Sequence, residues 1–388
     1  MNSQELSNQT YLWPQLCQAL VEKFSVLDAV SLHDYNNNIC GLEQKLNQYR
    51  GYNFGNYERL VFAMHDTEYF YLDSKVGFTT YNLIELLYTL DISLSHCIFY
   101  TAHHGITAHV NQLCKKYKVS YPITLIENNF STKQAQDVLA EYSEDSADNI
   151  QYSFCFLSNL VRDHRIYLRC YLHDRQLEDR TLLAWNGTPF DPINNAAEVQ
   201  KSTISTATYI TPIPFQSCAH KIIPNQMLNI LYQHNLNCLP HSTRNALIPS
   251  TQGNSNHSAE FLKYSFLNIV AETVFDYPYP YLTEKSFKSF WYKRPFVIVG
   301  AVGSLQYLKK IGFKTFDSWF DESYDLVVDP ADRMQAIFNL LDTVSKWSLD
   351  QCRDMYNQMK PVLKHNYLHY KNYFCQELLN QNIQQLTK

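Results

Sequence analysis

The sequence predicts an α/β protein with two domains in tandem and long helices at its carboxyl-terminal end. Two observations support this prediction. The chain has 388 residues, about twice the length of an ordinary domain. Its short apolar runs alternate with segments of helical periodicity, and a polar, acidic stretch at residues 128–151 separates two sets of these runs.

The elements follow one another in the same order in both halves. In the first half we expect strands at residues 60–64, 96–101 and 123–127, with helices at 81–90 and 105–117. In the second half we expect strands at 152–157, 261–270 and 295–299, with helices at 163–172, 284–291 and 304–311. Helical patterns at 331–347 and 349–379 close the chain, and 237–258 has the composition of a surface loop. The predicted domains are therefore residues 1–148 and residues 149–388, whose last helices can pack back on the first domain.

The composition argues against several classes of function. Hydrophobic residues make up 45% of the chain and charged residues 18%, which suits packed cores. The net charge of −5 gives no basic field of the kind that nonspecific nucleic-acid binding needs. The ten cysteines include no C-x-x-C pair, so we expect reduced thiols. No stretch approaches the ~18 apolar residues of a membrane span, and no signal peptide is recognisable. We therefore expect a soluble, cytoplasmic protein with no transmembrane segment and no nucleic-acid partner.

The most informative segment is Y-L-T-E-K, residues 281–285. Thr283 is a candidate N-cap, which would leave the N–H groups after it facing an anion at the positive end of the helix dipole. Lys285 adds a positive charge, Glu284 can accept hydrogen bonds from a ribose diol, and Tyr281 can pack on a ligand. The segment thus predicts a site for a nucleotide diphosphate. The alternative is an ordinary capped surface helix with solvated Glu and Lys side chains.

A second cationic cluster follows the predicted strand 152–157. It reads S-N-L-V-R-D-H-R, with Ser158, Asn159, Arg162 and Arg165 at the carboxyl end of that strand. On a helix, Arg162, Arg165 and Arg169 share one face, and arginines arranged in this way suit bidentate binding of phosphate. The alternative is a solvated basic face.

These segments together resemble the donor-binding domain of the α-1,3-fucosyltransferases (family 10), which have Y-x-T-E-K and a following strand that ends in glycine. The resemblance covers residues 152–303. It implies two Rossmann-like domains facing a cleft, a GT-B-like fold that uses a GDP-sugar. By position, Glu272 matches the family's E-N-S glutamate, Tyr281, Glu284 and Lys285 match its donor motif, and Arg162 or Arg165 would neutralise the diphosphate. The D-E-S-Y-D stretch at residues 321–325 resembles uncharacterised phage and bacterial glycosyltransferase-like proteins.

An inverting sugar transfer needs a base for the acceptor hydroxyl and positive charge for the departing diphosphate. Lys285 suits the second role. Asp66 and Glu68, in H-D-T-E after the strand 60–64, are the candidate bases, and solvated loop carboxylates are the alternative.

No D-x-D motif is present, so we expect a metal-independent enzyme with no cofactor besides its nucleotide-sugar substrate. His365 and His369 have no carboxylate motif between them, which predicts a packed or surface pair. His103 and His104 either contact a substrate or shape a loop.

Two hypotheses of different classes follow. The first is a glycosyltransferase that moves a sugar from a nucleotide-diphosphate donor to a glycan or other hydroxyl acceptor. The second is a noncatalytic nucleotide- or glycan-binding protein that keeps the same fold, because the chain has Glu272-Thr273-Val274 where the family has E-N-S. The arginine cluster alone would also permit another α/β enzyme that acts on a phosphorylated substrate.

Overall fold

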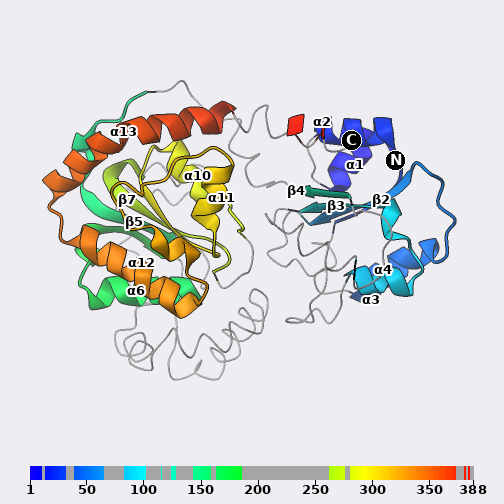
Figure 1. Ribbon diagram of the computed structural model, residues 1–388, viewed down its shortest axis with the longest axis horizontal. Helices are drawn as coiled ribbons and strands as arrows, with labels where there is room; N and C mark the ends of the chain where they lie inside the picture. The colour runs from blue at the N-terminus through cyan, green and yellow to red at the C-terminus, as the bar shows by residue number, and fades with distance from the viewer. Residues whose placement is uncertain are drawn as a thin grey trace. The chain divides into compact units, whose positions relative to one another are not determined.

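The computed structural model describes residues 1–10, 14–31, 39–64, 83–101, 115, 124–127, 143–158, 163–185, 262–275, 280–372, 380–381 and 383–384. The chain divides into two compact units. The first unit comprises Met1–Gln136 together with Asn372–Lys388, and the second comprises Asp137–Lys371. Each unit contains a four-stranded sheet with helices around it (Figure 1). The α/β class predicted from the sequence is confirmed.

The sheet of the first unit is parallel throughout and has the order β1-β2-β3-β4. Its strands are β1 (Ser25–Ser31), β2 (Glu58–Met64), β3 (Cys97–Thr101) and β4 (Thr124–Glu127). The helices α1 (Ser3–Thr10) and α2 (Pro14–Lys23) cover one face, and α3 (Ile39–Leu46) and α4 (Leu83–Thr89) lie on the other (Figure 1).

Both faces of this first sheet are buried, as a parallel sheet requires. Val61, Ile98 and Tyr100 pack with Leu16 and Leu20 of α2 in one hydrophobic cluster. Neighbouring strand residues point to the opposite face, where the rings of Phe62 and Phe99 stack with their centroids 5.3 Å apart. The alternation explains why β2 and β3 read as continuous apolar runs in the sequence.

The sheet of the second unit is also parallel and has the order β6-β5-β7-β8. Its strands are β5 (Tyr152–Ser158), β6 (Thr181–Trp185), β7 (Ser265–Ala271) and β8 (Phe296–Val299). One face carries α6 (Asp163–Asp174) and α12 (Pro330–Ser345), and the other carries α10 (Glu284–Trp291), α11 (Ser304–Lys310) and α13 (Leu349–Asn372) (Figure 1). Every residue of β7 and β8 is buried between these layers.

Short 3-10 helices complete the described elements: η2 (Asn47–Tyr49), η3 (Leu94–His96), η5 (Ala147–Asn149), η6 (Glu178–Arg180) and η10 (Ser323–Leu326). No helix in the described part of the chain combines the length and the apolarity needed to cross a membrane.

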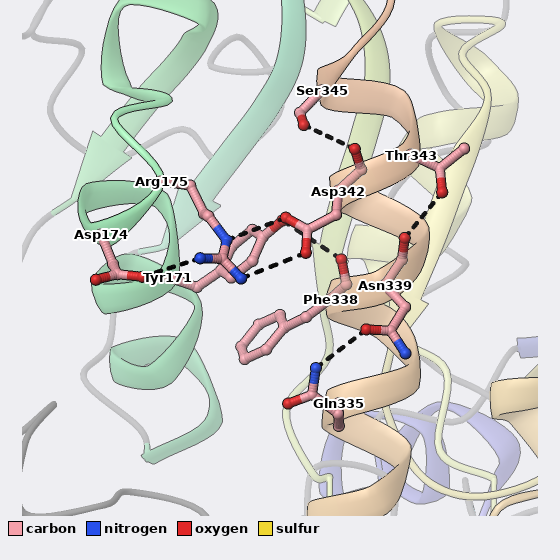
Figure 2. Close-up of polar contacts among 9 residues, drawn as sticks. All are labelled: Tyr171, Asp174, Arg175, Gln335, Phe338, Asn339, Asp342, Thr343 and Ser345. Atoms are coloured by element: carbon pink, nitrogen blue, oxygen red, sulfur yellow. Dashed lines mark hydrogen bonds and ion pairs between the residues drawn. The ribbon is translucent and has the colours of Figure 1, made fainter.

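A polar and aromatic contact joins α6 to α12 (Figure 2). The ring of Tyr171 stacks on that of Phe338 with 4.2 Å between centroids, and its hydroxyl donates to Asp342 Oδ1 at 2.7 Å. Arg175 donates to the same carboxylate from Nε at 3.1 Å. Burial and the neighbouring Asp342 carboxylate raise the pKa of Tyr171. The contact holds α6, the helix that begins at the candidate site, against its neighbour.

On the opposite face α13 closes the end of α11. His369 Nε2 donates to the carbonyl oxygen of Ile311 at 2.6 Å, and His365 Nε2 donates to that of Gly312 at 2.9 Å. Carbonyl groups at the end of a helix lack donors within the helix, and here the two imidazoles act as their donors. This pair, which the sequence predicted to be packed or on the surface, joins two helices. Gly312 has φ +92°, and a Cβ built there would lie 2.7 Å from the His369 ring.

Most predicted elements of the second unit have the bounds expected to within a few residues, whereas β1 and β6 were not predicted. Ser25, Asp28 and Ser31 interrupt the apolar pattern of β1, and its pairing with β2 shifts register between Val26 and Asp28. β6 has only five residues. The predicted loop 237–258 and almost all of the predicted helix 105–117 lie outside the described residues.

Candidate functional site

The segment Y-L-T-E-K lies in the second unit, next to the carboxyl end of β7. This strand lies between β5 and β8, and Glu272 follows its last residue. The helices α6, α10 and α11 all begin at this edge of the sheet. In parallel α/β sheets this is the edge at which ligands bind, because loops and helix starts converge there.

Glu272 is completely buried and ties β7 to the start of α10. Its Oε1 accepts from the backbone N–H of Thr283 at 3.0 Å and from Ser286 Oγ at 2.6 Å, and its Oε2 accepts from Thr283 Oγ1 at 2.5 Å. Three protein donors therefore satisfy this carboxylate, as a buried charge requires. Gly300 packs closely here, since a Cβ there would lie 3.2 Å from Ile298 Cγ2 and 3.4 Å from the Glu272 Cβ.

Thr283 is the N-cap of α10, as the sequence predicted. It has extended backbone geometry, and its Oγ1 accepts from the Lys285 N–H at 3.4 Å. The N–H of Thr283 itself is bonded to Glu272. Of the N–H groups after Thr283, that of Lys285 donates to the Thr283 hydroxyl and that of Ser286 donates to the Thr283 carbonyl at 3.2 Å.

Lys285 is the cation nearest to this helix start, and its side chain is 30% exposed. Its Nζ donates to Thr283 Oγ1 at 3.0 Å and to Thr273 Oγ1 at 3.2 Å, and it forms an ion pair with Glu284 at 3.2 Å. Burial opposes ionisation of Glu284, but Lys285 and Lys288 outweigh burial and lower the pKa of that carboxyl. Burial also lowers the pKa of the Lys288 ammonium. Two lysines, Lys285 and Lys288, therefore lie at this helix together with two carboxylates, Glu284 and the buried Glu272.

Two residues of α6 approach the same end of β7. Arg165 Nη2 donates to the carbonyl oxygens of Ala271 at 3.2 Å and Glu272 at 3.0 Å, and His164 Nε2 donates to the Glu272 carbonyl at 2.8 Å. The His164 ring also stacks on Phe275 with centroids 5.6 Å apart. Both α6 side chains are buried, at 3% and 2% exposure.

The structure brings several predicted residues together and leaves others outside its described part. Arg165 and Lys285, 120 residues apart in the sequence, both bond to the segment 271–273. Tyr281, four residues before Lys285, is buried, and Ser158 is buried at the end of β5. The remaining candidates lie outside the described residues: Asn159, Arg162, Asp66, Glu68, His103 and His104.

Arg333, which the sequence did not single out, adds a third cation to this edge. Its Nη2 donates to the carbonyl oxygen of Phe275 at 2.7 Å, and its Nη1 donates to those of Val327 and Val328 at 2.6 and 3.1 Å. The guanidinium carbon lies 4.5 Å from the centroid of the Phe275 ring. No local motif marks Arg333, because its acceptors are backbone groups, one of them 58 residues away.

The start of α11 already holds a carboxylate of the protein. Asp325 accepts from the N–H groups of Leu305 and Gln306, both at 2.9 Å, and its own carbonyl accepts from Gly303 at 2.8 Å. Gly303 has φ +79°, which only glycine adopts readily. Burial raises the pKa of Asp325, although these N–H groups favour its charged form. The D-E-S-Y-D segment thus closes this helix start.

No group of three or more side chains suited to a metal ion occurs among the described residues. Among the described residues, the cationic side chains at this edge include Arg165, Lys285 and Arg333. Searches for related proteins found no matching family model, no matching curated protein and no matching solved structure.

Proposed function

We propose that the chain is a glycosyltransferase that uses a nucleotide-diphosphate sugar and holds the nucleotide in the second unit. One observation carries the proposal. Arg165 from α6 and Lys285 from α10 both bond to the segment 271–273, at the carboxyl end of the central strand β7. Two cations at the ligand-binding edge of a parallel sheet suit a diphosphate.

Lys285 is the residue proposed to move its hydrogen bonds to the ligand. Two of its three acceptors are threonine hydroxyls, which are neutral. A phosphate oxygen carries negative charge, so it attracts the ammonium more strongly than a neutral hydroxyl oxygen does. A diphosphate placed over the 30% of this side chain that is exposed would therefore displace the hydroxyls. Thr273 and Thr283 hold the ammonium in position until then.

The chemistry proposed for this site is charge neutralisation of the leaving diphosphate. As the bond from the sugar to the diphosphate breaks, negative charge builds up on the phosphate oxygens, and fixed cations stabilise it. Ser158, Glu284 and Tyr281 would surround the nucleotide, which the family resemblance suggests is guanosine. The proposed reaction is inverting and metal-independent. Asp66 or Glu68 of the first unit would take the proton of the acceptor hydroxyl.

The two parallel α/β units suit the GT-B class, in which one unit binds the sugar donor and the other the acceptor. We propose this division for the chain, with the acceptor, a glycan or another hydroxyl compound, on the first unit. The same proposal predicts that the second unit alone accounts for nucleotide affinity.

A noncatalytic nucleotide- or glycan-binding protein is the second candidate, and Glu272 favours it. The carboxylate is fully buried and accepts three hydrogen bonds from Thr283 and Ser286, which supports an architectural role at a position that the resemblance assigns to the sugar donor. Turnover separates the two candidates. Diphosphate binding without hydrolysis or transfer from any nucleotide sugar would favour the binding protein.

Thermal unfolding in the presence of GDP, UDP, ADP and dTDP tests the site. A ligand at about 100 times its Kd adds about 2.7 kcal/mol, a shift of roughly 5 to 10 °C for a unit of this size. We expect Lys285→Ala to remove most of the shift. Lys310→Ala, which changes an exposed lysine of α11, is the matched control and should keep it. If no diphosphate stabilises the protein and Lys285→Ala changes nothing, the proposed site is wrong.

A further inference from the structure

A cluster of aromatic rings lies on the first unit, between η2 and β2. Tyr52 and Phe54 meet edge to face with centroids 4.8 Å apart, and Phe54 stacks on His96 at 4.9 Å. Tyr49 contacts both Tyr52 and Phe54, at 6.1 and 6.3 Å. We call these four residues, together with Tyr57, the aromatic surface. Tyr52 is 42% exposed and Tyr57 is 70% exposed, so two large rings face solvent.

Hydrogen bonds of its backbone groups fix the loop that carries the aromatic surface. The Gly51 N–H donates to the Leu90 carbonyl at 3.3 Å, with Gly51 at φ +61°. The Gly55 N–H donates to Glu58 Oε2 at 2.7 Å, and the carbonyl of Tyr57 accepts from Ser25 at 2.9 Å. Rings presented on a loop that is already ordered bind a ligand without a further ordering cost.

The base of the aromatic surface is anchored as well. Burial and the neighbouring Asp28 carboxylate raise the pKa of Tyr49 to about 12. Asp28 in turn forms an ion pair with Lys45 at 3.1 Å. Tyr49 therefore stays neutral and in place beneath the more exposed Tyr52 ring.

The polar groups around these rings favour a neutral ligand. Arg59 Nη1 donates to the carbonyl oxygens of Asn56 and Glu58 at 2.9 and 2.8 Å, and Arg50 Nε donates to Asn47 Oδ1 at 3.0 Å. Both arginines thus have acceptors in the protein. The Glu58 carboxylate, 3.5 Å from the Tyr52 hydroxyl, adds negative charge that would repel a phosphate.

We propose that the aromatic surface binds a neutral oligosaccharide. A pyranose ring has an apolar face of C–H groups that stacks on an aromatic ring, while its hydroxyls bond to carboxylates and amides such as Glu58, Asn53 and Asn56. A nucleic acid could also stack on these rings, but the Glu58 carboxylate beside the Tyr52 hydroxyl would repel its phosphates. The rings therefore match the sugar better than the polynucleotide.

The surface lies at one particular edge of the sheet of the first unit. The aromatic residues precede β2 and β3, which begin at Glu58 and Cys97, so they lie at the amino edge of the sheet. Chemistry in α/β proteins takes place at the opposite, carboxyl edge. The inference does not depend on the proposed sugar transfer, because a binding protein would use the surface equally.

Isothermal titration of the full chain with maltohexaose, cellohexaose and chitohexaose tests the inference. We expect at least one of them to bind, and Tyr52→Ala to weaken that binding about tenfold through loss of one stacked ring. Tyr52→Phe keeps the ring and should stay within about threefold of the parent. Tyr57→Ala, at a 70% exposed position, is the second variant and leaves the ring cluster intact.

Val328→Ala is the control, because it changes a residue of the second unit that is 77% exposed. It should leave oligosaccharide binding unchanged. The inference is overturned if no hexasaccharide binds in a manner that depends on Tyr52 or Tyr57, or if a single-stranded oligouridylate binds there instead. Failure of GDP to bind would count against the proposed function and leave the oligosaccharide result unaffected.

Discussion

Replacing Glu272 by alanine is the sharpest test of how the site is held together. The substitution removes a buried carboxylate and leaves three donors without their acceptor, namely the N–H and hydroxyl of Thr283 and the hydroxyl of Ser286. A hydrogen bond to a charged group contributes about 1.5 to 3 kcal/mol, and water entering the vacated space would restore part of that loss. We therefore expect a loss of about 3 to 5 kcal/mol in the free energy of unfolding.

Thermal unfolding followed by circular dichroism at 222 nm measures this loss. For a unit of this size the expected decrease in Tm is about 10 °C. Ser286→Ala removes only one of the three donors, so its cost should be about 1.5 to 3 kcal/mol. Glu284→Ala, which removes the neighbouring carboxylate on the partly exposed side of α10, should cost less than about 1 kcal/mol.

The order of the three variants decides whether the reasoning holds. It is refuted if Glu272→Ala unfolds within about 1 kcal/mol of the parent, or if Glu284→Ala costs as much as Glu272→Ala. A Glu272→Gln variant adds a functional comparison. It keeps the shape of the side chain, so any nucleoside diphosphate that binds the parent should still bind the folded variant if Glu272 is architectural.

Two further predictions concern α6 and its surroundings. Tyr171→Phe keeps the ring stack but loses the hydrogen bond to Asp342 (Figure 2). It should therefore lower the free energy of unfolding, measured in urea, by about 1 to 2 kcal/mol. The same loss in an Asp342→Asn background would show that the two side chains are not coupled, contrary to this prediction. Burial opposes ionisation of Glu178, but its bonds from His173 and Arg169 outweigh burial and hold its pKa below the usual 4.5. A carboxyl with a lowered folded-state pKa stabilises the protein above its unfolded pKa and loses that contribution as the pH falls through the folded pKa. Glu178→Gln should therefore destabilise at about pH 7, and the difference should shrink below pH 4.5, whereas a constant difference would exclude this carboxylate as the cause.

The sequence predicted the interior of the second unit well because its strands are buried on both faces. β5, β7 and β8 are nearly continuous apolar runs, and such runs stand out from the helices between them. β1 was missed because Asp28 lies inside it, and its carboxylate is accommodated by Lys45 from α3. That compensation comes from another element and is invisible in the local pattern.

The site was predictable in its local part only. Thr283 as the N-cap of α10 follows from a short motif, and the structure confirms it. The carboxylates that accept hydrogen bonds at the starts of α10 and α11 lie outside those local motifs. Glu272 lies 11 residues before Thr283, and Asp325 lies 20 residues after Leu305. Composition and spacing carry no information on such pairings, because the fold alone brings those residues together.

The discontinuous first unit has a consequence for how the chain folds during synthesis. Its core cluster includes Leu6 of α1 and Leu16 of α2, and Ile383 packs against the same cluster. The ribosome makes all of Asp137–Lys371 between these contributors. All residues of the second unit are synthesised before Ile383. The core of the first unit therefore stays incomplete until Ile383 has been made. Chaperones that shield apolar surface would therefore contact the first unit, whose synthesis begins earlier, for longer than the second unit.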